Sequence, residues 1–121
     1  MRKIPTCQDV LSAEDVTLPL LDVADRLGII VTRVHALIQE GKLVAVQRDG
    51  VAQVPERLLD ESSVNRFAPG VLAVLHDGGY SQEEALRWLY TEDETLPGRP
   101  VDALHGHLAR EVMRRAQASA F

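Results

Sequence analysis

The sequence has one cysteine, few aromatic residues and no long apolar run among its 121 residues. The lone cysteine, Cys7, excludes an internal disulfide framework and a cysteine-rich zinc site. No apolar stretch approaches the about 20 residues that a helix needs to cross a bilayer, and residues 1–6 lack the apolar stretch of a signal peptide. We therefore expect a cytoplasmic protein with no membrane partner.

Basic residues are also fewer than acidic ones, with 13 Lys and Arg against 18 Asp and Glu, so the net charge is −5. An acidic chain argues against a nucleic-acid partner, which usually requires a basic surface. The charge is uneven, however, since residues 1–25 carry −3, residues 26–57 carry +2 and residues 58–121 carry −4. The middle part alone is therefore suited to an anionic partner. What the sequence does have is 45% hydrophobic residues, enough for a modest core.

Residues 1–17 show no sustained periodicity and predict a flexible N-terminal arm. Two short amphipathic helices are predicted next, because apolar residues recur at three- and four-residue spacing. These apolar positions are Leu20, Val23, Ala24 and Leu27 in the first helix, and Val34, Leu37 and Ile38 in the second. Gly28 and Gly41 end the two helices, since glycine accepts the left-handed conformation of a helix C-terminus.

A β-hairpin is predicted after the second helix. Valine-rich stretches flank Asp49-Gly50, and this dipeptide suits a type I′ turn because both central residues need a positive φ. Pro55 ends the second strand, since proline has no N–H to donate to a ladder. Two helices, a tight turn and a hairpin follow the order of a winged helix-turn-helix, which we place at residues 18–58.

This order predicts contact with double-stranded DNA. The second helix, about residues 31–40, would enter the major groove, and the wing, about residues 47–51, would contact the adjacent backbone. Arg33 is the strongest candidate, because an arginine can bind a guanine or a phosphate through two hydrogen bonds. The candidate DNA contacts are Thr32, Arg33, His35, Ala36, Gln39, Lys42 and Arg48.

Residues 59–121 are predicted to form a C-terminal helical domain. Ser81 and Glu84 have the spacing of a capping box at a helix start. A last helix is predicted to begin at Pro100 and to bury one apolar face. That face is formed by Val101, Leu104, Leu108 and Val112. The expected fold is thus mainly α with a small β-hairpin: a winged helix-turn-helix followed by a C-terminal helical subdomain.

Nothing in the sequence predicts an enzyme, a bound metal or a cofactor. Ser81 has no His–acid arrangement near it in the sequence, and glycine-rich phosphate loops are absent. His105 and His107 would point about 200° apart on a helix, so they could not share one ion without other ligands. We interpret Trp88 as a core residue.

The first half of the chain resembles a known DNA-binding motif. Residues 20–46, with Leu27-Gly28 and Gly41-Lys42-Leu43, resemble the excisionase/MerR-type helix-turn-helix. That pattern usually has Ser or Thr where Ile30 stands, and the Ile30 side chain cannot cap the recognition helix. The resemblance implies a winged helix in which the second helix reads DNA.

The second half extends the resemblance. Residues 87–107, with Trp88-Leu89 and the stretch from Gly98 to Asp102, resemble the C-terminal domain of a small actinobacterial family of winged-helix DNA-binding proteins. This resemblance implies a transcriptional regulator. The mycobacterial member is a substrate of a serine/threonine protein kinase, which implies a kinase partner and phosphorylation of the arm. Thr6 is then the candidate acceptor, where a phosphate would add about −1.5 to −2 charge and repel DNA.

An alternative function stays open. The same stretch is loosely similar to the toxin-binding domain of Xre/MbcA/ParS-type antitoxins. The C-terminal helices would then bind another protein, and the winged helix would be a scaffold that does not bind DNA. Arg99 and Asp102 are likewise open to two interpretations. They could form an ion pair that fixes the loop at a helix N-terminus, or they could contact a partner.

Overall fold

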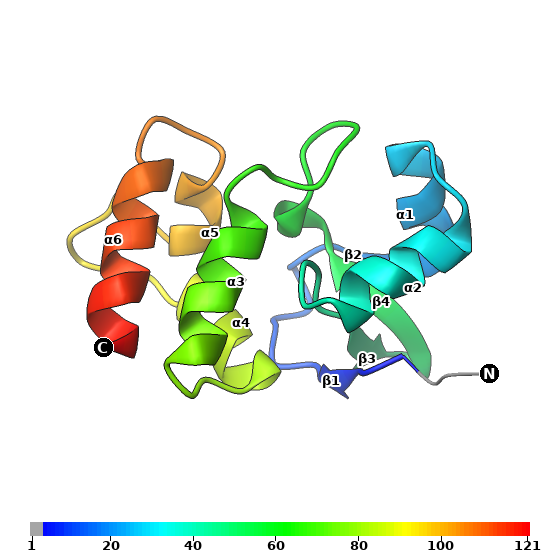
Figure 1. The fold of residues 1–121 in the computed structure, drawn as a ribbon, viewed down its shortest axis with the longest axis horizontal. Coiled ribbons are helices and arrows are strands. Elements are labelled where there is room, and N and C mark those ends of the chain that lie inside the picture. Colours follow the sequence, from blue (N-terminus) through cyan, green and yellow to red (C-terminus); the bar gives the residue numbers. More distant parts are fainter. Residues whose placement is uncertain (1–3) are drawn as a thin grey trace.

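A small sheet and two helices form the first half of the computed structural model, in which residues 4–121 are described (Figure 1). The strands are β1 (Cys7–Gln8), β2 (Thr17–Pro19), β3 (Val46–Arg48) and β4 (Val51–Pro55), and the helices are α1 (Leu20–Leu27) and α2 (Val31–Gln39). The sheet has the order β1-β3-β4-β2. β1 is parallel to β3, whereas the other pairs are antiparallel. We call residues 4–58 the winged unit.

The segment before α1 belongs to this sheet. Cys7 pairs with Val46, and its N–H donates a hydrogen bond to the Ala45 carbonyl at 2.9 Å. Thr17 pairs with Pro55 at the opposite edge. The prediction of a flexible arm is therefore wrong for residues 4–17. Strands of two and three residues are too short to produce a periodic signal, and their partners lie far away in the sequence.

The helix-turn-helix has the predicted form. Gly28, at φ 67°, ends α1 in the left-handed conformation. The two helices pack through apolar residues that share one buried face. These are Val23 and Ala24 in α1, and Val34 and Ile38 in α2. Ile30 precedes α2 and gives it no side-chain cap, as expected from the sequence.

The wing is the predicted hairpin. Asp49 and Gly50, between β3 and β4, have φ values of 55° and 75°. Positive φ at both positions is what a type I′ turn requires. The Asp-Gly pair therefore determines both the turn and the register in which Arg48 faces Val51.

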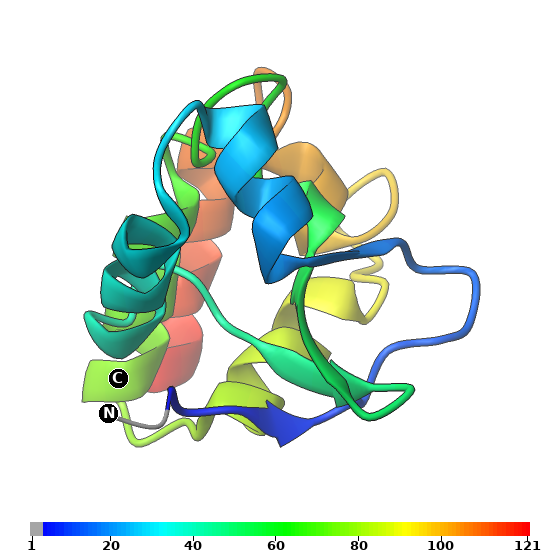
Figure 2. The ribbon, with the colours of Figure 1, turned by 90° about the vertical axis from the view of Figure 1, so that its right-hand side faces the viewer.

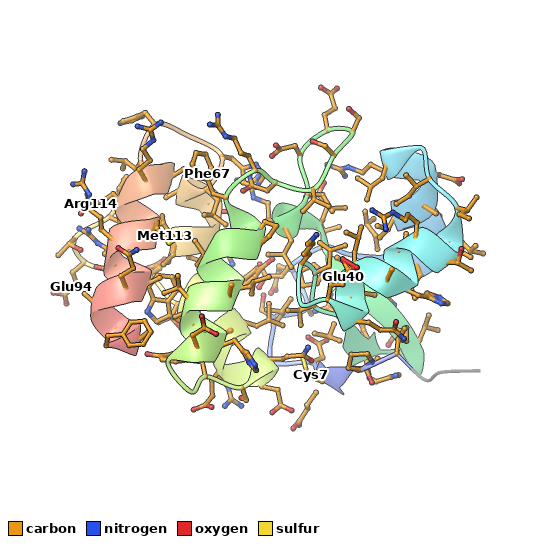
Figure 3. The ribbon with its side chains drawn as sticks, viewed as in Figure 1. Cys7, Glu40, Phe67, Glu94, Met113 and Arg114 are labelled. Atoms are coloured by element: carbon orange, nitrogen blue, oxygen red, sulfur yellow. The ribbon has the colours of Figure 1, made fainter. Side chains whose placement is uncertain are left out.

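A bundle of helices forms the second half of the molecule, which we call the helical unit (residues 59–121). Its elements are α3 (Ala68–Asp77), α4 (Gln82–Tyr90), α5 (Pro100–Ala103) and α6 (Ala109–Ala120), and the short 3-10 helix η1 (Glu56–Leu58) leads into it. α3 and α6 lie side by side (Figure 1). Met113 of α6 points toward α3, where its methyl group packs near Gly70 (Figure 3). The predicted capping box at Ser81 and Glu84 is present at the start of α4.

The last helix is interrupted, which corrects the sequence prediction. α5 ends at Ala103, and α6 begins six residues later at Ala109. Gly106 lies in this break, where glycine lowers helix propensity by about 1 kcal/mol relative to alanine. Val101, Leu104 and Val112 are nevertheless buried as expected. The apolar spacing thus predicted burial correctly and helix continuity incorrectly.

The two units contact each other directly. β1 packs against α4, and η1 packs against α5. Figure 2 shows the chain looping out from β1 past the wing and back to β2 before it enters α1. Across residues 4–121, no helix combines the length and the apolar character that a bilayer crossing requires.

Candidate nucleic-acid interface

The outer face of α2 is polar and accessible. Val34 and Ile38 are buried on the inner face, so the helical period turns Thr32, Arg33 and Gln39 outward, where all three are exposed. His35 and Ala36 are half-buried beside them. The structure therefore brings five of the seven candidate contacts together on one helix.

Arg33 is the accessible cation of this face. Its side chain is exposed, and it forms no ion pair with another residue of the described chain. Lys42 follows the helix and lies 3.4 Å from Glu40, with half of each side chain exposed. An exposed pair of this kind contributes only about 0–1 kcal/mol, so Lys42 can exchange Glu40 for another anion. Glu40 itself places an acid at the end of α2 (Figure 3).

Arg48 is engaged by other residues at the wing, so its expected contact with DNA stays a prediction. Its Nε lies 2.6 Å from Asp9 Oδ2, and its two terminal nitrogens donate to the carbonyls of Asp15 at 2.6 Å and Ser12 at 3.0 Å. Only 16% of the side chain is exposed. The reason is that residues 9–15 fold back over β3 and offer three acceptors to one guanidinium. In this arrangement Arg48 cannot also hold a phosphate.

The segment of residues 9–15, which we call the acidic loop, is fastened at its other end to the helical unit. Asp15 Oδ1 lies 2.7 Å from Arg99 Nη1, and Arg99 Nε lies 3.0 Å from Asp102 Oδ2. Asp102 also accepts from Arg57 at 3.0 Å. The predicted Arg99–Asp102 ion pair is present, and Asp15 extends it into a network that the sequence did not reveal.

These ion pairs lower the pKa values of the acids involved. The hydrogen bond from Arg48 is the main reason that the pKa of Asp9 lies below its ordinary value. Burial raises the pKa of Asp15, but hydrogen bonds from Arg99 and from Ser12 outweigh burial and leave it lowered. The carboxylates of Asp9 and Asp15 therefore remain charged, and keep their arginine partners, at neutral pH.

Thr6 lies next to the wing rather than in a free arm. It is half-buried, and its Oγ1 accepts a hydrogen bond from Gln47 Nε2 at 3.3 Å. Gln47 belongs to β3 and is followed directly by Arg48. A phosphate on Thr6 would therefore be introduced close to the wing.

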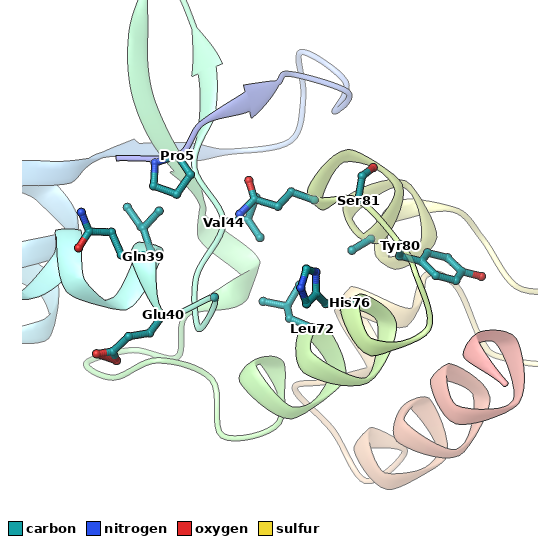
Figure 4. A pocket seen from close by; sticks show the side chains of 12 residues that line it. Pro5, Gln39, Glu40, Val44, Leu72, His76, Tyr80 and Ser81 are labelled. Carbon is teal, nitrogen blue, oxygen red and sulfur yellow. The ribbon is translucent and has the colours of Figure 1, made fainter. Parts of the chain in front are cut away.

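A cavity of about 240 Å³ separates the end of α2 from the helical unit. Gln39 and Glu40 contribute to one wall, and His76 and Tyr80 contribute to the other (Figure 4). The sequence offers no signal for it, because its walls come from segments that are distant in the chain.

Histidines do not form a metal site in the described part of the chain. No group of three or more His, Cys, Asp or Glu side chains among residues 4–121 is arranged to hold an ion. His105 instead has Nε2 2.7 Å from the Arg57 carbonyl and Nδ1 3.3 Å from Asp60. It thereby connects the helical unit to the end of the winged unit.

Two helices, a tight turn and a wing, with a helical bundle behind them, define a winged helix-turn-helix protein. The chain belongs to the Rv2175c family. Residues 3–59 match the family described as "DNA-binding protein Rv2175c, wHTH domain", and residues 65–120 match "Rv2175c C-terminal domain of unknown function". This confirms the resemblance to an actinobacterial winged-helix family.

The relatives match over nearly the whole chain. DNA-binding protein Rv2175c of Mycobacterium tuberculosis is 44% identical over an alignment 131 residues long, which covers 98% of this chain and 90% of the relative. The NMR structure of Rv2175c superposes with a TM-score of 0.88 over the same shares of the two chains. The fold class predicted from the sequence is therefore confirmed.

Proposed function

We propose that this protein binds double-stranded DNA and regulates transcription, with α2 in the major groove. The observation that carries the proposal is the exposed polar face of α2, on which Arg33 forms no ion pair with any other residue of the range 4–121. Ala36 lies between Arg33 and Gln39 on this face, and its small side chain lets the helix approach the base edges closely. The name of the 44% identical relative, DNA-binding protein Rv2175c, supports the same function.

Each residue of the face has a definite role in this proposal. Arg33 forms two hydrogen bonds to a guanine edge or to a phosphate. Thr32 and Gln39 donate or accept at neighbouring base edges, while Lys42 contacts the backbone beyond the end of α2. His35, at the edge of the face, supplies a further hydrogen bond to a base or a phosphate.

Few cations serve this interface, so one subunit should bind modestly and with strong salt dependence. Each phosphate that is neutralised contributes about −0.9 to the slope of log K against log salt concentration. Arg33 and Lys42 together predict a slope of about −2 at most. The negative charge of residues 58–121 requires the helical unit to face away from the duplex.

Replacement of Arg33 tests the proposal. We expect Arg33→Ala to weaken binding to genomic DNA fragments about tenfold or more, since a good bidentate contact contributes about 1–3 kcal/mol. Fluorescence titration at low and moderate salt measures the effect. Arg110→Ala is the matched control, because Arg110 is also exposed but lies on α6. Absence of salt-sensitive binding, or equal loss in both variants, would contradict the proposal.

We further infer that phosphorylation of Thr6 by a serine/threonine kinase weakens DNA binding. Thr6 contacts Gln47 of β3, so a phosphate of about −1.5 to −2 charge would stand beside the wing. Mass spectrometry should find the modified residue after incubation with such a kinase, and Thr6→Ala should abolish it. Thr6→Glu should lower DNA affinity in a salt-dependent manner, whereas unchanged affinity would contradict this regulation.

The adaptor function has one observation in its favour. A wide, open groove of about 680 Å³ in the helical unit presents Tyr80 and Trp88 together with several acids. The acids are Glu84, Glu92, Asp93 and Glu94. Such a groove suits a basic segment of another protein. If DNA binding fails, a pull-down would test the adaptor function. Retention of a basic partner protein by the unaltered chain, and loss of that partner from the Glu92→Gln/Glu94→Gln variant, would favour an adaptor.

A further inference from the structure

The wing carries one basic side chain, and that side chain is turned inward. Arg48 is the one Lys or Arg in residues 46–55. The wing is the part of a winged helix that reaches the DNA backbone, so an arginine there is well placed for a phosphate. Here its guanidinium binds Asp9 through two nitrogens, at 2.6 and 3.3 Å. The Asp9 carboxylate thus occupies the position that a phosphate would take.

The acidic loop that supplies this carboxylate is held from both sides. Arg48 also donates to the backbone carbonyls of Ser12 and Asp15. The side chain of Asp15 is bound by Arg99 of the helical unit at 2.7 Å. Asp15 therefore accepts hydrogen bonds from both units, through its carbonyl from the wing and through its carboxylate from the helical unit.

This arrangement makes two states mutually exclusive. A guanidinium that is engaged by a carboxylate and two carbonyls has no free edge for a bidentate phosphate contact. The acidic loop also places two carboxylates, Asp9 and Asp15, beside the wing, where they repel a polyanion. Movement of the acidic loop away from Arg48 would free one cation for DNA and would also move two negative charges away from the wing.

We propose that the acidic loop is an autoinhibitory latch. With the latch closed, Asp9 holds Arg48 and DNA is bound through α2 alone. With the latch open, Arg48 contacts the DNA backbone and affinity rises. Because Arg99 fastens the far end of the loop, a change in the helical unit that withdraws Arg99 opens the latch. This inference rests on the proposed DNA-binding function and describes its regulation.

The first test compares two charge-neutralising substitutions within the same loop. Asp9→Asn removes the carboxylate that binds Arg48, while Glu14→Gln removes an exposed charge that forms no hydrogen bond to Arg48. We expect Asp9→Asn to raise DNA affinity at least threefold more than Glu14→Gln does. It should also steepen the salt dependence by about 0.9, the contribution of one additional phosphate.

Arg48 must be required for this gain. Arg48→Gln alone should leave affinity within twofold of the original chain, and Asp9→Asn/Arg48→Gln should lose the gain. Equal effects of Asp9→Asn and Glu14→Gln, or a gain that persists without Arg48, would overturn the latch. Thermal unfolding of each variant checks that it is folded.

Arg99→Gln provides a second test that does not alter the wing. It removes a positive charge, so simple electrostatics predicts weaker DNA binding. An open latch predicts the opposite, a gain in affinity that again requires Arg48. A loss of affinity in a folded Arg99→Gln variant would overturn the coupling between the helical unit and the wing.

Failure of the latch can be distinguished from failure of DNA binding. The Arg48 Nε–H should give a resolved, slowly exchanging NMR signal in the full chain at neutral pH, because it donates to Asp9. Asp9→Asn should remove that signal, and Glu14→Gln should retain it. If no chain binds DNA, the proposed function fails. If the signal survives in Asp9→Asn, the latch fails, whatever the DNA result.

Discussion

At the scale of single residues, Asn65 shows how one polar side chain can hold together three segments of the helical unit. It is only 2% exposed, and all of its polar side-chain atoms are bonded. Its Oδ1 accepts from the N–H groups of Phe67 and Ala68 at the start of α3. Its Nδ2 donates to Asp60 and to the Leu104 carbonyl. The loop after η1, α3 and the end of α5 therefore share one anchor.

We predict that Asn65→Ala lowers the free energy of unfolding by about 1–3 kcal/mol, the cost of leaving buried polar groups unsatisfied. Urea unfolding followed by circular dichroism measures it. Ser62→Ala is a suitable control, because Ser62 is exposed nearby and surface substitutions usually stay within about 0.5 kcal/mol. Equal stability of the two variants would show that Asn65 does not anchor these segments of the helical unit.

At the scale of elements, the sequence was informative wherever the signal was local. α1, α2 and the hairpin depend on apolar spacing over a few turns, on Gly28 and on Asp49-Gly50, and all of them formed as predicted. The exposure of Thr32 and Arg33 followed directly from the buried positions of α2. Residues of one element are related by its period, so their faces can be deduced without knowledge of the rest of the fold.

Elements that depend on distant partners could not be predicted in this way. β1 has two residues and pairs with β3, whose residues lie 39 positions later. The partners of Arg48 lie between 33 and 39 positions earlier. Nothing in either sequence segment indicates these contacts, because they arise only when distant segments of the winged unit pack together. The break between α5 and α6 was also missed, although Gly106 lies in it. Two tertiary contacts occur there: the Leu104 carbonyl accepts a hydrogen bond from Asn65, and His105 contacts the Arg57 carbonyl.

At the scale of the whole molecule, ion pairs connect the winged unit, including its acidic loop, to the helical unit. Asp15 pairs with Arg99, and Asp102 joins Arg99 to Arg57 just beyond β4. Burial raises the pKa of Asp102, but hydrogen bonds from Arg99 and Arg57 leave it below its ordinary value. The pKa values of Asp9 and Asp15 are lowered as well. Folding therefore favours the charged form of all three acids.

This linkage predicts how stability depends on pH. In the unfolded chain these aspartates have a pKa of about 3.9. In the folded chain their pKa values are lower. The unfolded chain therefore binds more protons as the pH falls through this range, so the free energy of unfolding should decrease. The stabilisation is fully present above about pH 5 and is lost progressively below about pH 4.

Urea unfolding at a series of pH values measures this dependence. A variant with Asp9→Asn, Asp15→Asn and Asp102→Asn should be less stable than the original chain at pH 7, yet lose less stability on acidification. A matched variant with Glu14→Gln, Asp22→Asn and Asp25→Asn, which alters three exposed acids, should keep the original slope. If both variants show the same slope as the original chain, the ion pairs of Asp9, Asp15 and Asp102 do not control acid stability. The latch would then be held by its backbone hydrogen bonds rather than by charge.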